Sequence, residues 1–310
     1  MVSRVTTPGN YSAVIFNLLS AQQRQADASE KVATQRNGSN LKDFAKNAEL
    51  ITGMKSVQAR LTVFQDQQSL IADKLATQDS ALVRVADAAQ SVRQAMMEAI
   101  ATGRADTLVV DVEAQLHNAV EGMNTRYAGK YLFAGGQVDT KPVTATTLSD
   151  LTIPPAVIAS FFKNDTFQVQ AKLDEATTVN TGFRADQIGT NMMSAFQAFE
   201  AFQQGPNGPF NGPLTTAQQT FLEGQLANWD QARADVTNLA AQNGVNEKRI
   251  QTVGYDLEAR QNTLAGMLGD VTDADLAEAS GQLKAAQLAV QSAAYVFAAL
   301  KESSLLNILR

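Results

Sequence analysis

The stretch of sequence that decides the fold runs from Met54 to Ala99 and reads MKSVQARLTVFQDQQSLIADKLATQDSALVRVADAAQSVRQAMMEA. Apolar side chains recur in it every seven residues, at two positions of the repeat. The first position holds Met54, Leu61, Gln68, Leu75, Leu82, Ala89 and Met96, and the second holds Val57, Phe64, Ile71, Gln78, Val85, Val92 and Ala99. This pattern predicts a coiled-coil helix of roughly 65–70 Å. Gln68 and Gln78 interrupt the apolar seam, where polar residues lower stability but can fix the register.

The prolines separate two helical flanks from a different central region. Six of the seven prolines lie between Pro142 and Pro213, and proline breaks helix interiors. Thr102-Gly103-Arg104 is expected to end the first helix, and Asp106 is a suitable N-cap for a second one. The apolar face of that second helix is Val109, Val112, Leu116, Val120 and Met123. Because the connection is short, the two helices are expected to be antiparallel.

The C-terminal flank repeats the seven-residue pattern. A helix is expected from about Thr216 to a break near Gly269-Asp270. A second series follows this break and comprises Leu276, Leu283, Val290 and Phe297, paired with Ala279, Ala286, Ala293 and Leu300. The alanines in this series predict a partner helix that approaches closely.

The central region has strand and turn character. Nine of the fourteen phenylalanines lie between Phe161 and Phe221, and residues 166–173 alternate in the manner of a strand. Gly205 to Pro213 is dense in turn residues and is expected to be a loop. The predicted organisation has five segments: an N-terminal assembly segment (1–40), two stalk segments (41–137 and 214–270), an inserted strand-containing variable domain (138–213) and a C-terminal assembly segment (271–310).

The composition excludes several classes of function. The 310 residues include no cysteine and one histidine, which excludes disulfides, thiolate catalysis and Cys-ligated zinc. Acidic side chains outnumber basic ones by 31 to 25, which argues against a nucleic-acid partner. His117 has no second histidine or cysteine with which to bind a metal. The spacing of Asp270, Asp273 and Asp275 is not that of a calcium-binding loop. Gly135-Gly136 is not part of a phosphate-binding loop pattern. We therefore expect no enzyme, no cofactor and no metal site.

The N-terminal segment has neither a spanning apolar stretch nor a cleavable signal, so no membrane partner is expected.

The two ends of the chain are expected to depend on partners for their structure. Burial of the few large apolar side chains after Asp273 does not offset the entropy of ordering that segment. We expect both termini to be disordered in the monomer and helical in an assembly. The residues expected on this assembly face are Tyr11, Ile15, Leu18, Leu19, Leu276, Leu283, Val290, Phe297, Leu300, Leu305 and Leu306. The residues expected to form the stalk seam are Leu61, Phe64, Ile71, Leu75, Leu82, Val85 and Val92.

Three separated motifs stand out along the chain. The first is the opening Arg4-Val5-Thr6-Thr7 with Tyr11 and Leu18-Leu19. The second is residues 129–136, Gly-Lys-Tyr-Leu-Phe-Ala-Gly-Gly. The third includes residues 275–279, Asp-Leu-Ala-Glu-Ala, and the segment from Ser304 to Leu309. Together these motifs resemble the flagellin superfamily and, within it, the hook-filament junction proteins, whose turn out of the stalk is similar to residues 129–136. The central region carries none of this resemblance.

The resemblance implies a mainly α-helical, flagellin-like fold with a long antiparallel coiled-coil stalk and a small inserted domain. It implies a structural subunit that assembles with itself in a ring and joins the hook to the flagellin filament. The implied partners are a hook-side junction protein, flagellin and a cytoplasmic export chaperone. The implied location is the extracellular flagellum, which the chain would reach by type III export without a cleaved signal. Two alternatives remain open: flagellin itself, and a soluble coiled-coil adaptor.

Overall fold

The computed structural model describes residues 7–308, and the side chains of residues 12–302. Within these residues the chain is mainly α-helical and contains two small antiparallel sheets, as the sequence predicts. The helices are α1 (Thr7–Thr34), α2 (Ala48–Thr102), α3 (Leu108–Met123), α4 (Ala185–Gln203), α5 (Thr216–Thr272) and α6 (Leu276–Ile308). The strands are β1 (Arg126–Tyr127), β2 (Lys130–Tyr131), β3 (Gln170–Lys172) and β4 (Thr178–Asn180), with β1 paired to β2 and β3 to β4. Three short 3-10 helices are η1 (Leu41–Phe44), η2 (Ser149–Thr152) and η3 (Ile158–Phe161).

The chain packs as two compact units. The stalk unit comprises residues 62–258, and the terminal unit comprises residues 7–61 and 259–308 of the described chain. Both α2 and α5 are long enough to contribute to both units. The five-segment organisation read from the sequence stays a prediction.

The heptad seam of α2 is buried as predicted at one of its two positions. All seven residues of the series from Met54 to Met96 are buried. In the second series, Val85 and Val92 are fully buried, Phe64 and Ile71 are half-buried, and Val57 is 38% exposed, so the prediction for Val57 is wrong. A straight helix turns by about 20° per heptad away from an ideal 3.5-residue repeat, so one edge of a long seam rotates toward solvent.

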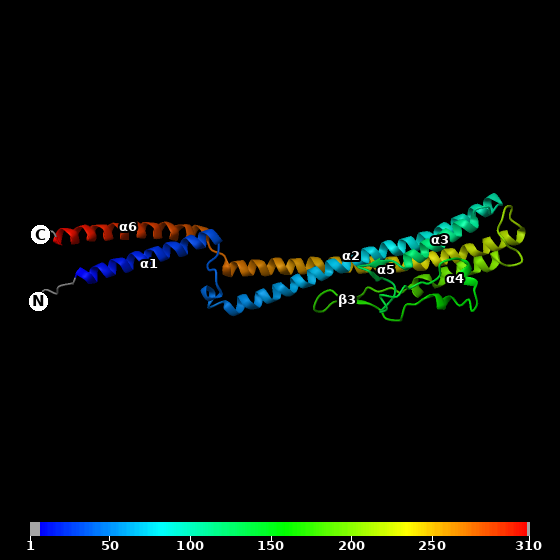
Figure 1. Cartoon of the computed structure of the whole chain (residues 1–310), viewed down its shortest axis with the longest axis horizontal. Helices are drawn as coiled ribbons and strands as arrows, with labels where there is room; N and C mark the ends of the chain where they lie inside the picture. The colour runs from blue at the N-terminus through cyan, green and yellow to red at the C-terminus, as the bar shows by residue number, and fades with distance from the viewer. Residues whose placement is uncertain (1–6, 309–310) are drawn as a thin grey trace. The chain divides into compact units, whose positions relative to one another are not determined.

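The core of the stalk unit is built from α2, α3, α4 and α5. Val85, Leu116, Met192 and Trp229, one from each helix, belong to a single buried apolar cluster. Helices α3 and α4 lie alongside the two long helices in Figure 1. Gly122 of α3 permits a close approach to α2, because a Cβ added there would lie 2.6 Å from Cγ2 of Val85.

Two sequence predictions around α3 and α4 are corrected by the structure. Asp106 does not cap α3: Thr107 occupies the N-cap position, and Asp106 forms an ion pair with Arg104 at 2.7 Å. The phenylalanine-rich region was expected to be a strand domain, but part of it forms α4. Ile188, Met192, Phe196 and Phe199 follow helical spacing and form the buried side of that helix.

The strand predicted over residues 166–173 is confirmed only at Gln170–Lys172. Asp174 follows β3 in the turn of the β3–β4 hairpin, and its Oδ1 accepts hydrogen bonds from the backbone N–H groups of Ala176 and Thr177. At the open end of the hairpin, the carbonyl oxygen of Val169 accepts hydrogen bonds from the N–H groups of both Thr181 and Gly182, which interrupts the regular ladder. Local turn chemistry therefore makes the strand shorter than its alternating pattern suggests. The loop predicted at Gly205 to Pro213 is confirmed.

Candidate assembly surfaces

Helices α1 and α6 lie side by side in the terminal unit (Figure 1). Four alanines are buried along them: Ala21 and Ala28 of α1, and Ala279 and Ala286 of α6. Ala28 and Ala286 line the same groove, so these alanine-bearing faces meet. Small side chains allow two helices to approach closely. The structure thus provides α6 with a close partner helix in the same chain.

The residues predicted for the assembly face fall into three groups. Leu18, Leu283, Val290, Phe297 and Leu300 are half-buried. Ile15, Leu19 and Leu276 are exposed. Tyr11, Leu305 and Leu306 lie outside the residues whose side chains the structure describes. The predicted set therefore does not form one exposed surface, and its role in assembly stays a prediction.

A second set of apolar side chains on these helices was missed in the sequence. Phe16 is 72% exposed, Leu288 is 64% exposed and Tyr295 is 80% exposed, and Val296 is also exposed. Leu288 and Tyr295 are seven residues apart, which is the signal that could have identified them. We call these four side chains, together with Leu19 from the predicted assembly face, the exposed apolar set: Phe16, Leu19, Leu288, Tyr295 and Val296. Large exposed apolar patches are typical of interaction sites.

Helix α6 is apolar over most of its length. The stretch Leu276–Glu302 is long and apolar enough to cross a membrane by length and composition, and 6% of its most apolar window is buried. Its alanines meet α1, so part of this composition serves helix pairing. The apolar side chains of α6 that α1 does not cover include Leu288, Tyr295 and Val296, which are exposed.

Two connectors are joined at the end of this helix pair. Gln35, Arg36 and Asn37 follow α1, and residues 273–275 connect the last residue of α5, Thr272, to α6. The N–H of Asn37 donates to the Thr272 carbonyl at 2.8 Å, and the N–H of Ala274 donates to the Gln35 carbonyl at 2.9 Å. The Asn37 side-chain amide also donates to the Asp273 carbonyl at 2.8 Å. We call these three hydrogen bonds the connector bracket. The bracket holds the end of α1 near the start of α6.

The two glutamines of the stalk seam make specific polar contacts. Nε2 of Gln68 donates to the Leu173 carbonyl at 3.3 Å, and so attaches the β3–β4 hairpin to α2. Nε2 of Gln78 donates to Oδ1 of Asn243 on α5 at 3.0 Å. Gln78 and Asn243 are both fully buried.

Asn243 completes this buried cluster. Its Nδ2 donates to the Leu75 carbonyl at 3.0 Å and to Oε1 of Glu247 at 3.1 Å. Burial, and then the nearby Asp79 carboxylate, raise the pKa of Glu247 against the opposing effect of the Asn243 hydrogen bond. Oε1 of Gln78 has no hydrogen-bond partner among the described residues. A buried amide pair of this kind favours one alignment of α2 against α5.

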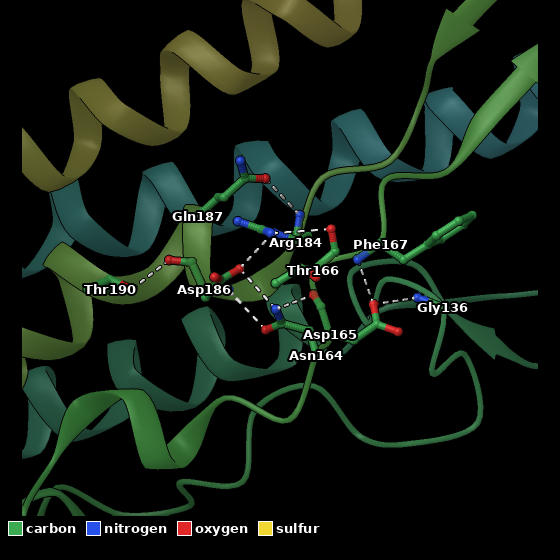
Figure 2. Close-up of polar contacts among 9 residues, drawn as sticks. All are labelled: Gly136, Asn164, Asp165, Thr166, Phe167, Arg184, Asp186, Gln187 and Thr190. Atoms are coloured by element: carbon green, nitrogen blue, oxygen red, sulfur yellow. Dashed lines mark hydrogen bonds and ion pairs between the residues drawn. The ribbon is translucent and has the colours of Figure 1, made fainter.

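The glycine turn of the second motif is held by an acidic side chain. Gly135 has a φ of +69°, and the Gly136 N–H donates to Oδ1 of Asp165 at 2.9 Å (Figure 2). The same oxygen accepts from the Phe167 N–H at 2.9 Å. These two backbone hydrogen bonds, with a smaller contribution from Arg184, lower the pKa of Asp165. A Cβ added at Gly135 would lie 2.2 Å from Oδ1 of Asp165, so this carboxylate requires a glycine there.

A neighbouring contact ties the same loop to the start of α4. Nδ2 of Asn164 donates to Oδ1 of Asp186 at 2.9 Å, and the Asp186 N–H donates back to Oδ1 of Asn164 at 3.2 Å (Figure 2). Nε of Arg184 pairs with Asp186 at 3.2 Å. No sequence pattern predicts this reciprocal pair, because its members lie 22 residues apart.

Trp229 and His117 contact only other parts of the protein in the structure. Trp229 is fully buried and contacts Phe196 edge to face, with ring centroids 4.7 Å apart. His117 is exposed on α3, and its Nδ1 lies 3.0 Å from the Glu113 carbonyl oxygen. Over the described residues no group of three or more His, Asp or Glu side chains is placed to hold a metal ion.

Comparisons with known proteins agree with this architecture. Residues 226–309 match the model of the bacterial flagellin C-terminal helical region, a range that includes most of α5 and all of α6. No curated protein sequence matches the chain. A putative flagellar hook-associated protein from Vibrio parahaemolyticus superposes with a TM-score of 0.61 at 13% identity, covering 74% of this chain and 100% of that one.

Two further solved structures share the fold. Flagellar hook associated protein-3 from Legionella pneumophila has a TM-score of 0.58 at 12% identity, with 71% of this chain and 98% of that chain covered. Bacillus cereus FlgL has a TM-score of 0.56 at 17% identity, with 70% and 99% covered. The family model thus confirms the C-terminal part of the resemblance, and the solved structures confirm the predicted fold. Residues 226–309 of the chain match the flagellin C-terminal helical region, and the chain shares its fold with flagellar hook-associated proteins.

Proposed function

We propose that this chain is a structural subunit of the bacterial flagellum that joins the hook to the flagellin filament. The observation that carries the proposal is the match of residues 226–309 to the flagellin C-terminal helical region, because that region includes most of α6 and its exposed apolar side chains. An exported subunit with such a surface needs neighbours to cover it. The solved structures that share the fold are named as hook-associated proteins, which favours the junction over other places in the flagellum.

The terminal helices are the proposed contacts between subunits. The buried alanines bring α1 and α6 together, and the exposed apolar set remains available for other copies of the chain. The subunits form a ring, with a hook-side junction protein on one side and flagellin on the other. The role is structural, with no catalysed reaction.

Export through the flagellar type III route fits the same proposal. Such a route passes an unfolded chain, and a chain without cysteine needs no disulfide to refold outside the cell. The apolar series of α6, including Leu283, Val290 and Phe297, is the proposed contact for a cytoplasmic chaperone before export. The chain then functions outside the cell without a cleaved signal.

Deletion followed by electron microscopy tests the junction role. We expect cells with hooks but no filaments, and flagellin monomers in the medium. Normal filaments in the deletion strain would contradict the proposal.

Complementation with surface variants tests the proposed contact. Leu288→Ser with Tyr295→Ser removes two members of the exposed apolar set and is expected to leave filaments missing. Val110→Ser is the matched control, because Val110 is 71% exposed but lies on α3 in the stalk unit. If both variants restore filaments equally, the contact is assigned wrongly.

Two alternatives are separated by simple observations. A flagellin would polymerise into long filaments when purified, whereas a junction subunit would stop at short oligomers. A soluble coiled-coil adaptor would be absent from sheared flagella and would remain in the cytoplasm.

A further inference from the structure

Four asparagines in this chain are followed by glycine: Asn37, Asn207, Asn211 and Asn243. Asparagine can lose its side-chain amide when the next backbone nitrogen attacks its Cγ carbon. A following glycine favours the attack, because it has no Cβ and its backbone reaches the required geometry easily. The reaction needs a free backbone N–H, an accessible side chain and room to move.

The four sites differ in these requirements. Asn37 and Asn211 are exposed, and the N–H groups of Gly38 and Gly212 donate no hydrogen bond within the described part of the chain. Asn207 is also exposed, but the Gly208 N–H donates to the Gly205 carbonyl at 3.0 Å. Asn243 is fully buried and Gly244 lies inside α5, where backbone N–H groups bond to the preceding turn.

Asn37 is the member of this set whose reaction has a structural consequence. Its side-chain amide makes one of the three hydrogen bonds of the connector bracket, to the Asp273 carbonyl. That hydrogen bond is solvent-exposed, so it opens readily and releases Cγ for attack. A carboxylate in place of the amide has no proton to donate to a carbonyl oxygen.

We propose that Asn37 is a site of spontaneous deamidation, and that the product weakens the connector bracket. The Gly38 nitrogen forms a bond to Cγ of Asn37 and gives up its proton, and the Cγ–Nδ2 bond breaks with loss of ammonia. Water then opens the succinimide ring at either carbonyl and leaves aspartate or isoaspartate. No oxidant, cofactor or enzyme is required. This proposal does not depend on the flagellar function, because the bracket is internal to the chain.

Mass spectrometry of the folded full-length chain, incubated at mildly alkaline pH and digested, tests the site assignment. Asn37 and Asn211 are expected to gain the mass of deamidation at least about tenfold faster than Asn207 and Asn243, whose reaction requires a rare open state. Asn207 and Asn211 are a matched pair, since both stand in an Asn-Gly-Pro triplet. In denaturant this pair is expected to react at equal rates. The proposal is overturned if Asn37 reacts no faster than Asn243 in the folded chain, or if Asn207 keeps pace with Asn211.

Amide hydrogen exchange tests the consequence. Asn37→Asp supplies one product directly, and Asn211→Asp is the control, because Asn211 belongs to the loop before α5 in the stalk unit and takes no part in the bracket. We expect exchange at the Ala274 N–H to be about fivefold faster in Asn37→Asp, the equilibrium effect of one net hydrogen bond. Asn211→Asp is expected to leave that rate unchanged. Equal rates at Ala274 in Asn37→Asp and the unchanged chain would refute the effect on the bracket.

Discussion

The buried pair of Gln78 and Asn243 gives the sharpest prediction for stability. In Asn243→Leu, Nε2 of Gln78 loses its acceptor while its Oε1 already lacks a partner among the described residues. A buried polar group left unpaired costs about 1–3 kcal/mol, and each lost hydrogen bond adds about 1 kcal/mol. Asn243 also donates to Leu75 and Glu247, so three hydrogen bonds are lost in all and the expected loss of unfolding free energy is about 4–6 kcal/mol.

The double variant Gln78→Leu with Asn243→Leu shows how much of the loss of unfolding free energy in Asn243→Leu comes from the unpaired Gln78. The double variant removes the unpaired amide of Gln78 but still leaves Leu75 and Glu247 without their hydrogen bonds from Asn243, so it is expected to be about 1–3 kcal/mol more stable than Asn243→Leu and less stable than the unchanged chain. Urea unfolding followed by fluorescence measures this, because Trp229 is the single tryptophan and is buried in the same unit as the pair. A double variant destabilised by the sum of the two single losses would refute the reasoning.

Three further predictions test other parts of the structure. Gly135→Ala is expected to destabilise the stalk unit by at least about 1 kcal/mol more than Gly129→Ala. Both glycines have a positive φ, but only Gly135 faces Asp165. Equal losses of unfolding free energy in urea would contradict this contact. Hydrogen bonds from the side chain and backbone of Thr146, and then from the backbone of Thr147, lower the pKa of Asp150 from 3.8 to about 2. The stabilisation from Asp150 is therefore complete above about pH 4 and is lost as the pH falls through the pKa of about 2 in the folded chain. The unfolding free energy of Asp150→Asn should therefore depend less steeply on pH between about 2 and 4. The same pH dependence in both chains would contradict this prediction. In the free monomer, amides of α6 are expected to exchange faster than those of the stalk unit, and slow exchange across residues 276–306 would contradict the predicted disorder of the termini.

The sequence predicted the long helices well because one physical rule governs them. Heptad spacing places Leu75 and Leu82 on one face of α2 whatever the neighbouring element is, and both are fully buried. The rule fails at Val57, since a seam that rotates along a straight helix cannot stay covered at both positions.

The central region was harder to predict because its elements are set by contacts distant in sequence. Phe196 and Phe199 have helical spacing, but phenylalanines also favour strands, and only packing against Trp229 and Phe210 decides between them. The glycine turn depends on Asp165, which lies 29 residues from Gly136. Neither propensity nor periodicity reports such a partner.

The exposed face of α6 could not be predicted from the sequence. The sequence identifies α1 and α6 as apolar helices, and the alanine spacing correctly indicates a close partner. It does not indicate that α1 covers the alanine face, which leaves Leu288 and Tyr295 exposed. The exposed face has only one seven-residue apolar step, from Leu288 to Tyr295, which is a weaker signal than the four-residue series that begins at Leu276.

The proposed junction role is tested most directly by where the chain lies in an intact flagellum. Immunogold electron microscopy with an antibody to the stalk unit is expected to label one narrow zone between the hook and the filament. Labelling along the whole filament would show a flagellin instead, and label confined to the cytoplasm would contradict the account.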